Sequence, residues 1–180
     1  AISDDGSILA IGFLNITEIS ISSRVSFYEI NSNAYKSSET ENPVFASFTE
    51  ENAAFGAIRF LDNSSLAAVS DKSITFVELK PNETEKYKEK SKIQFKNQIK
   101  QIAFDQNSNI YISFGDKLIN SETDALENGT VIGYNKNGGE LFRIQTKRKV
   151  TGIYPKNRNI LIGMARYFHC YDLSGNFLWE

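Results

Sequence analysis

The sequence is poor in the residues that cross-link a chain, bind metals or carry out catalysis. Its 180 residues include one cysteine, Cys170, and one histidine, His169. A single cysteine excludes a disulfide within the chain and a cysteine-rich zinc or iron–sulfur site, and a single histidine excludes a histidine metal triad. The longest apolar runs, such as residues 160–164, are far shorter than the ~20 residues of a membrane-spanning helix.

Catalytic motifs are also missing. The sequence contains no P-loop, no dinucleotide-binding glycine fingerprint, no Gly-x-Ser-x-Gly elbow and no His-Glu-x-x-His pair. His169 and Cys170 are adjacent in an expected strand, so they point to opposite faces and cannot act as a base and its nucleophile. The aspartates near residues 4, 62 and 105 lack the acid spacing of an EF-hand calcium loop. The sequence therefore predicts a protein that is not an enzyme and holds no cofactor or metal.

Aromatic and small polar residues, by contrast, are plentiful. The chain has thirteen Phe and eight Tyr against three Pro and one Met, and 41% of its residues are hydrophobic. Aromatic and β-branched residues favour strands, whereas Asn, Ser and Gly favour turns. We therefore expect an all-β chain with enough apolar side chains to build a core.

A degenerate four-strand pattern recurs four times along the chain. In each copy a polar turn precedes an apolar strand, and these turns lie at residues 4–7, 62–65, 105–109 and 156–159. The strands that follow them are expected at residues 8–11, 66–69, 110–112 and 160–163. Asp and Asn side chains bond to backbone groups two residues on, and Asn and Gly accept left-handed conformations, so these turns are typical of β-hairpins.

The other strands of each copy follow the same pattern. An entering strand is expected at 57–60, 101–104 and 151–154, a third strand at 25–30, 74–79, 131–135 and 168–173, and a fourth at 87–95, 140–144 and 176–179. The aligned third-strand residues Tyr28, Val77, Tyr134 and Tyr171 are 49, 57 and 37 residues apart, which brackets the roughly 40–50 residues of a propeller blade. Alternating charges over residues 83–92 indicate a solvated outer strand.

The third and fourth copies share a distinctive hairpin. Residues 134–142 and 171–179 both run from a tyrosine through a glycine-containing turn to an aromatic residue, Phe142 in one copy and Trp179 in the other. This hairpin resembles the quinoprotein-type β-propeller repeat, although the first two copies lack the glycine. WD-type repeats fit less well because the Gly-His and Trp-Asp dipeptides are missing. The chain is similar to uncharacterised propeller domains of low-GC, Gram-positive bacterial membrane proteins, a resemblance that implies no particular activity.

The repeats predict the fold class. We expect an all-β, β-propeller-like array of about four four-stranded antiparallel blades that forms part of a larger propeller. Residues 1–180 would be a single propeller domain or a fragment of one, with blades at about 1–48, 49–97, 98–146 and 147–180. A β-sandwich or another solenoid is the alternative. Strand order separates the two, because a propeller consists of consecutive meanders without a Greek-key crossing.

The two ends of the chain differ in charge. Residues 1–60 hold eight acidic and three basic residues, a net charge of −5, whereas residues 131–180 hold three acidic and eight basic residues, a net charge of +5. The first copy begins at its turn, and the chain begins at Ala1 rather than Met. We therefore expect either further blades upstream or a partner that covers the apolar faces of the terminal blades. The opposite charges favour a head-to-tail homodimer.

Recognition of a protein, a peptide or a cell-envelope ligand is the predicted function, because propeller loops form rigid platforms. One basic cluster is a candidate site for phosphate or an acidic partner and comprises Lys147, Arg148, Lys149, Lys156 and Arg158. A pI near 5.6 argues against nucleic-acid binding.

The expected location is extracytoplasmic, in a membrane-anchored or cell-surface protein of bacteria whose anchor lies outside this chain. Two alternatives stay open at this point. The chain could be a fragment of a quinoprotein-type dehydrogenase, or it could be a structural spacer of a surface protein.

Overall fold

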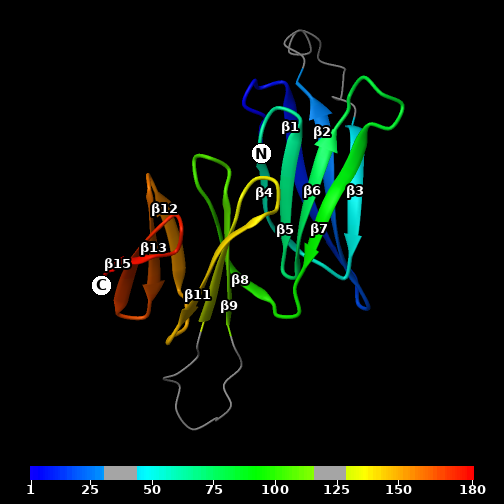
Figure 1. Ribbon diagram of the computed structural model, residues 1–180. Coiled ribbons are helices and arrows are strands. Elements are labelled where there is room, and N and C mark those ends of the chain that lie inside the picture. The colour runs from blue at the N-terminus through cyan, green and yellow to red at the C-terminus, as the bar shows by residue number, and fades with distance from the viewer. Residues whose placement is uncertain (31–43, 116–128) are drawn as a thin grey trace. The chain divides into compact units, whose positions relative to one another are not determined.

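A computed structural model describes residues 1–30, 44–115 and 129–180 (Figure 1). These residues form strands, turns and loops and contain no helix. Consequently, no helix in the described ranges has the length and apolar character to span a membrane. The all-β composition expected from the sequence is confirmed.

The strands form four sheets in chain order (Figure 1). The first sheet contains β1 (Ile8–Ile16), β2 (Ile21–Glu29) and β3 (Val44–Glu51), and the second contains β4 (Phe55–Phe60), β5 (Ser65–Ser70), β6 (Ser73–Leu79) and β7 (Tyr87–Gln94). The third contains β8 (Ile99–Phe104), β9 (Ile110–Gly115), β10 (Gly129–Tyr134) and β11 (Glu140–Thr146). The fourth contains β12 (Gly152–Lys156), β13 (Asn159–Met164), β14 (Tyr167–Asp172) and β15 (Phe177–Trp179).

Every sheet is a meander, because the strands that are neighbours in a sheet are also consecutive in the chain. The pairs are antiparallel, and an isolated bridge between Ile2 and Leu9 lies beside β1, where the other sheets have their entering strand. No strand of the described residues crosses to another sheet. This order is that of propeller blades and differs from the Greek-key order of a sandwich.

Strand register confirms the internal repeat. The four aligned residues Tyr28, Val77, Tyr134 and Tyr171 pair with Leu9, Leu66, Ile110 and Ile160 respectively. Each partner occupies an equivalent place in the second strand of its copy. The alignment made from sequence therefore identifies structurally equivalent positions in all four sheets.

One strand was missed by the sequence prediction. β3 lies after residues 31–43, which are outside the described part of the chain, and no strand was expected there. Its signal is the alternation that places Ala46 and Phe48 on the buried face while Ser47 and Thr49 lie on the other. The expected solvated outer strand at 83–92 is confirmed by β7, whose side chains are mostly exposed.

Three five-residue turns have the same hydrogen bonds. They span residues 105–109, 135–139 and 172–176, and each begins with an Asp or Asn side chain. The side-chain oxygen of Asp105, Asn135 or Asp172 accepts hydrogen bonds of 2.8–3.0 Å from the backbone N–H groups two and four residues on. The fourth residue has a positive φ, which is 84° at Gly138 and 83° at Gly175. Turn formation therefore accounts for these polar residues.

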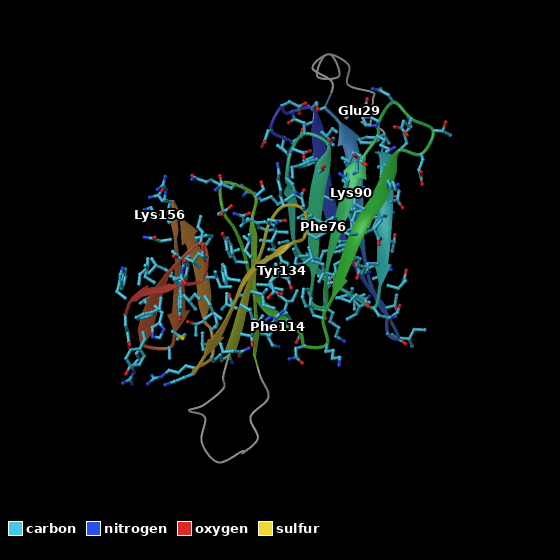
Figure 2. All side chains as sticks on the ribbon, viewed as in Figure 1. Glu29, Phe76, Lys90, Phe114, Tyr134 and Lys156 are labelled. Carbon is cyan, nitrogen blue, oxygen red and sulfur yellow. The ribbon has the colours of Figure 1, made fainter. Side chains whose placement is uncertain are left out.

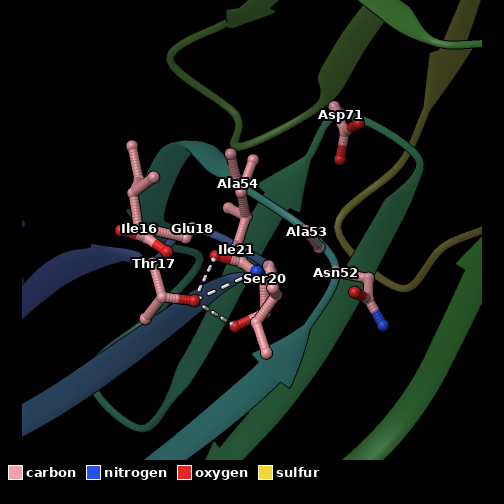
Figure 3. A pocket seen from close by; sticks show the side chains of 10 residues that line it. Ile16, Thr17, Glu18, Ser20, Ile21, Asn52, Ala53, Ala54 and Asp71 are labelled. Carbon is pink, nitrogen blue, oxygen red and sulfur yellow. Dashed lines mark hydrogen bonds between the residues drawn. The ribbon is translucent and has the colours of Figure 1, made fainter.

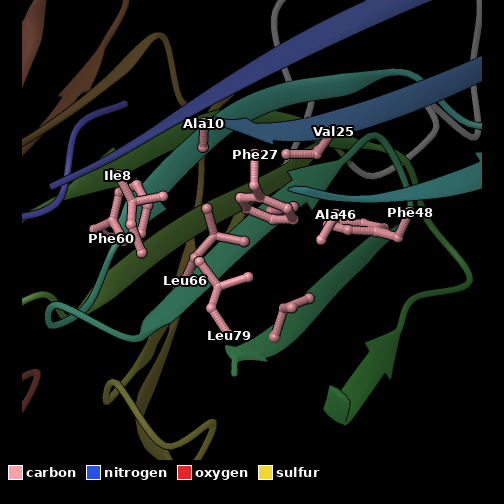
Figure 4. Packing of buried hydrophobic residues seen from close by; sticks show 11 residues of the cluster. Ile8, Ala10, Val25, Phe27, Ala46, Phe48, Phe60, Leu66 and Leu79 are labelled. Atoms are coloured by element: carbon pink, nitrogen blue, oxygen red, sulfur yellow. The ribbon is translucent and has the colours of Figure 1, made fainter. Parts of the chain in front are cut away.

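The sheets belong to two compact units, Ala1–Ile93 and Gln94–Glu180. In the first unit, Ala10, Phe27 and Ala46 of the first sheet pack against Leu66 and Val77 of the second (Figure 4). In the second unit, Tyr111 and Phe142 of the third sheet pack against a cluster of the fourth sheet that includes Ile160, Ile162 and Tyr171. Each unit thus has a core between its two sheets.

Candidate functional site

Exposed apolar side chains are concentrated on the first and fourth sheets. Fifteen large hydrophobic side chains of the described residues are exposed, and all but Leu141 belong to residues 2–44 or 154–179. Single exposed hydrophobic residues are ordinary, but a concentration of this kind marks an interaction surface. The sequence predicted exposed terminal faces without identifying the residues that form them.

The fourth sheet carries an apolar row on one face. Tyr154 on β12 pairs with Leu161 on β13, Leu161 pairs with Cys170 on β14, and Cys170 pairs with Trp179 on β15. Directly paired residues of antiparallel strands lie on the same face, so these four side chains form one row. Phe168 lies two residues from Cys170 and shares this face. We call these five residues the C-terminal face.

An equivalent row in the third sheet is buried. Tyr111 pairs with Gly133, and Gly133 pairs with Phe142. Tyr111 and Phe142 lie in one core cluster with Ile160, so this row packs against the next sheet along the chain. Trp179 holds the position of Phe142 in the fourth sheet but is 52% exposed. The C-terminal face is thus as apolar as a contact between two sheets, but its large side chains Tyr154, Phe168 and Trp179 are exposed.

The first sheet exposes the other side of the repeat, the side that in the fourth sheet packs against the third sheet. Leu9, Ile11 and Phe13 alternate along β1, and Tyr28 of β2 pairs with Leu9, so these four residues share one side of the sheet. Ile11 is 37% exposed and Phe13 is 39% exposed, and the Arg24 guanidinium lies 5.0 Å from the centre of the Phe13 ring. We call Leu9, Ile11, Phe13 and Tyr28 the N-terminal face.

The fourth sheet shows how such a face is normally covered. Its residues equivalent to Leu9 and Tyr28 are Ile160 and Tyr171, and both are buried in the core shared with the third sheet. Burial raises the pKa of Tyr171, which agrees with its place under that sheet. The N-terminal face is thus the surface that receives a preceding sheet in this repeat.

The predicted basic cluster is divided by β12. Lys147, Arg148 and Lys149 lie in the connection before β12, whereas Arg158 lies in the hairpin to β13. Lys156 is the last residue of β12 (Figure 2). The two groups lie at opposite ends of β12, whose five residues span about 13 Å. Arg148 lies against Tyr167, with its guanidinium carbon 4.1 Å from the ring centre. The residues of the predicted basic cluster therefore form two smaller groups, one at each end of β12.

The remaining polar candidates form local contacts. Nδ1 of His169 lies 3.2 Å from the Tyr171 hydroxyl, and its ring meets Phe177 edge to face. Cys170 is buried on the opposite side of β14. Within the described ranges, no three His, Cys, Asp or Glu side chains gather where they could hold a metal ion.

Comparison with solved structures supports the propeller fold. BBS1N, a β-propeller, matches in its crystal structure in complex with ARL6DN, with a TM-score of 0.50 and 12% identity. The match covers 89% of this chain and 49% of BBS1N, so the chain spans about half the length of that protein. BamB from Moraxella catarrhalis matches with a TM-score of 0.39 and 13% identity, covering 98% of this chain and 71% of BamB.

Sequence comparison identifies the family. No curated protein matches the chain. One family matches residues 1–178, nearly the whole chain, and it is described as a family of unknown function, DUF5711. With its four meander sheets of propeller type, the chain belongs to this family of unknown function, DUF5711.

Proposed function

We propose that the protein is a non-catalytic binding or scaffold module that engages partners through sheet-on-sheet packing. One observation carries the proposal. The row that contains Phe142 is buried under the next sheet, whereas the three large aromatic side chains of the C-terminal face, Tyr154, Phe168 and Trp179, are 52–56% exposed. An apolar blade face that lacks its neighbouring sheet is a docking surface for another sheet of similar shape.

A second copy of the chain is the partner that fits both faces. The C-terminal face of one copy would pack on the N-terminal face of the other, as the third sheet packs on the fourth within one chain. The acidic residues at 1–60 and the basic residues at 131–180 carry −5 and +5 charges, which favour this head-to-tail arrangement. Lys147, Lys149, Lys156 and Arg158 contribute to the positive end and would meet an acidic or phosphorylated surface.

The structural neighbour gives independent support for a protein partner. BBS1N was crystallised in complex with another protein, ARL6DN. Propellers present their loops and faces on a rigid scaffold, so protein recognition suits the fold. We include a structural spacer in the same proposal, since a spacer would also associate through its sheet faces.

Association can be tested by analytical ultracentrifugation of wild type, Ile11→Lys and Trp179→Lys over a wide concentration range. Each lysine places an unpaired charge in one face, so we expect wild type to dimerise and both variants to remain monomers. Leu141→Lys is the control, because Leu141 is 40% exposed but lies in neither face. A wild-type monomer at every concentration would overturn the proposed association.

Mixing the two variants tests the head-to-tail geometry. The Trp179→Lys protein keeps its N-terminal face, and the Ile11→Lys protein keeps its C-terminal face. An equimolar mixture should therefore recover association through one intact contact. Mixing would not increase association if dimers paired two N-terminal faces or two C-terminal faces. Absence of recovery in the mixture would therefore contradict the head-to-tail arrangement.

We further propose that the module is extracytoplasmic, in an envelope protein of Gram-positive bacteria. The resemblance to propeller domains of membrane proteins supports this location. Protease treatment of intact cells that carry the full-length protein should degrade the module. Complete protection in intact cells, with degradation after lysis, would place the module inside the cell.

A quinoprotein-type dehydrogenase is the second candidate function. The turn at 172–176, in which Asp172 bonds two backbone N–H groups before an aromatic strand, favours this repeat class. Titration with pyrroloquinoline quinone and calcium, followed by absorbance, separates the candidates. Saturable binding of quinone would support the dehydrogenase, whereas an unchanged spectrum supports the binding module.

A further inference from the structure

A pocket lies at the end of the β1–β2 hairpin in the first unit (Figure 3). Its volume is about 450 Å³. Its walls come from three segments that are distant in sequence, namely the β1–β2 turn, the β3–β4 connection at residues 52–54, and Asp71 between β5 and β6. A concave site assembled from several loops is a common form of ligand site.

Hydrogen bonds hold these walls together. The backbone N–H of Asn52 donates to the carbonyl oxygen of Ile21 at 2.7 Å, and that of Asp71 donates to the carbonyl oxygen of Ala54 at 3.2 Å. Side-chain and backbone bonds between the first and last residues close the turn at 17–20. The pocket is therefore formed before any ligand binds.

The charged residues that line the pocket are acidic. Glu18 and Asp71 are its only charged residues, and no Lys or Arg contributes to the walls. Oδ1 of Asp71 is buried and has no hydrogen-bond partner within the described ranges. Most buried polar atoms in proteins are paired, so the Asp71 carboxylate keeps an unused acceptor beside the pocket.

The large apolar side chains of the lining come from the hairpin. Ile16, Ile19 and Ile21 line the pocket, and Ile19 is 96% exposed at the tip of the turn. Packing of isoleucine against an apolar chain removes apolar surface from water and so favours binding. A positively charged donor forms a strong, charge-assisted hydrogen bond with a carboxylate. The combination matches a ligand that has an alkyl or similar apolar body and ends in a cation.

We propose that this pocket binds an organic cation, in which an alkylammonium or guanidinium group bonds to Asp71 and its carbon chain packs on the three isoleucines. A lysine or arginine side chain of a peptide and a free amine share this chemistry. The site is separate from the N-terminal face, because Ile16 shares the side of β1 that carries Ala10 whereas Phe13 lies on the other. Binding at the pocket thus does not depend on the proposed association.

Isothermal titration with n-hexylammonium and n-hexanol tests the proposal. The two probes have the same alkyl chain and differ in charge, so we expect saturable binding of the ammonium and at least about tenfold weaker binding of the alcohol. Asp71→Asn should weaken ammonium binding by a similar factor and leave the alcohol unaffected. Glu85→Gln is the control, since Glu85 is an exposed carboxylate outside the pocket.

Two further arms complete the test. In the first arm, N-acetyl-arginine amide and an acetylated Ile-Lys dipeptide amide replace hexylammonium. Tighter binding of the dipeptide than of hexylammonium would identify a peptide as the source of the cation. Glu18→Gln, at the solvated hairpin tip, serves if Asp71→Asn fails to fold, and it should also weaken the ammonium selectively. Equal binding of ammonium and alcohol, or unchanged binding by both carboxylate variants, would overturn the proposal.

Discussion

Phe142 occupies the space that a side chain on Gly175 would need. A β-carbon built on Gly175 would lie 2.8 Å from Cβ of Phe142. Gly175 belongs to the turn between β14 and β15, and Phe142 belongs to β11, so this contact joins the fourth sheet to the third. The same aromatic ring covers Gly133 and stacks on Tyr111 with 6.0 Å between centroids.

Replacement of Gly175 by alanine should destabilise the protein. The residue has φ of 83°, a region that is unfavourable for alanine, and the new methyl group would also collide with Phe142. We expect the free energy of unfolding to fall by roughly 2–4 kcal/mol. Urea denaturation followed by tryptophan fluorescence would measure the change, because Trp179 lies in the same sheet.

Gly6→Ala separates the backbone effect from the collision. Gly6 has φ of 72°, but a β-carbon there would have no neighbour within 4 Å. This variant should lose only about 1–2 kcal/mol. Equal losses in the two variants would show that Phe142 moves aside without cost, contrary to the close packing seen here.

Asp172→Asn should alter the dependence of stability on acid while preserving the turn. The side-chain amide of Asn176 and the backbone N–H groups of the turn donate to the Asp172 carboxylate and lower its pKa from 3.8. The turn at 135–139 makes the same backbone bonds with Asn135, so asparagine is compatible with this geometry. Stability near pH 7 should therefore change little.

The difference should appear below pH 4. A carboxyl group whose pKa is lower in the folded state binds fewer protons there than in the unfolded chain. Its contribution is complete above the unfolded value of 3.8 and is lost as the pH falls through the lower folded value. The denaturation midpoint of wild type should thus fall more steeply with acid than that of Asp172→Asn. Parallel curves from pH 6 to pH 2 would contradict the assigned pKa shift.

The strands and turns of this fold could be predicted from sequence because their signals are local. Asp105 and Asp172 stand directly before the strands or turns that they organise, and each bonds groups within four residues. Equivalent positions could also be aligned, since Tyr134 and Tyr171 occupy the same register. Local hydrogen bonding and alternation were sufficient for the class and the repeat.

The surfaces could not be predicted in the same way because they depend on non-local geometry. The division of the basic cluster is an exception, because the strand expected at 151–154 already separates Lys149 from Lys156. The pocket at Asp71 requires three segments that meet only in the folded unit. Trp179 is exposed because, within the described residues of its unit, no further sheet packs on its side of the fourth sheet, and its residue type alone would suggest a buried position.

Glu50 gives a final test of contacts that the sequence did not reveal, because it lies on the missed strand β3. Its carboxylate accepts a hydrogen bond of 2.8 Å from the Ser73 hydroxyl and lies 2.8 Å from Nζ of Lys92. Ser73 belongs to β6 and Lys92 to β7, so Glu50 joins the first sheet to the second. Its side chain is only 13% exposed, which limits screening of this pair by water.

Glu50→Ala should therefore reduce the free energy of unfolding by roughly 2–3 kcal/mol, since the Ser73 hydroxyl and the Lys92 ammonium lose their acceptor. Glu50→Gln keeps an acceptor for Ser73 without the charge and should have an intermediate effect. The exposed pair of Lys80 and Glu83 provides the comparison, and Glu83→Ala should leave urea denaturation unchanged. Equal stability of Glu50→Ala and wild type would mean that the polar contacts of Glu50 add nothing and that the apolar core between these sheets is sufficient to join them.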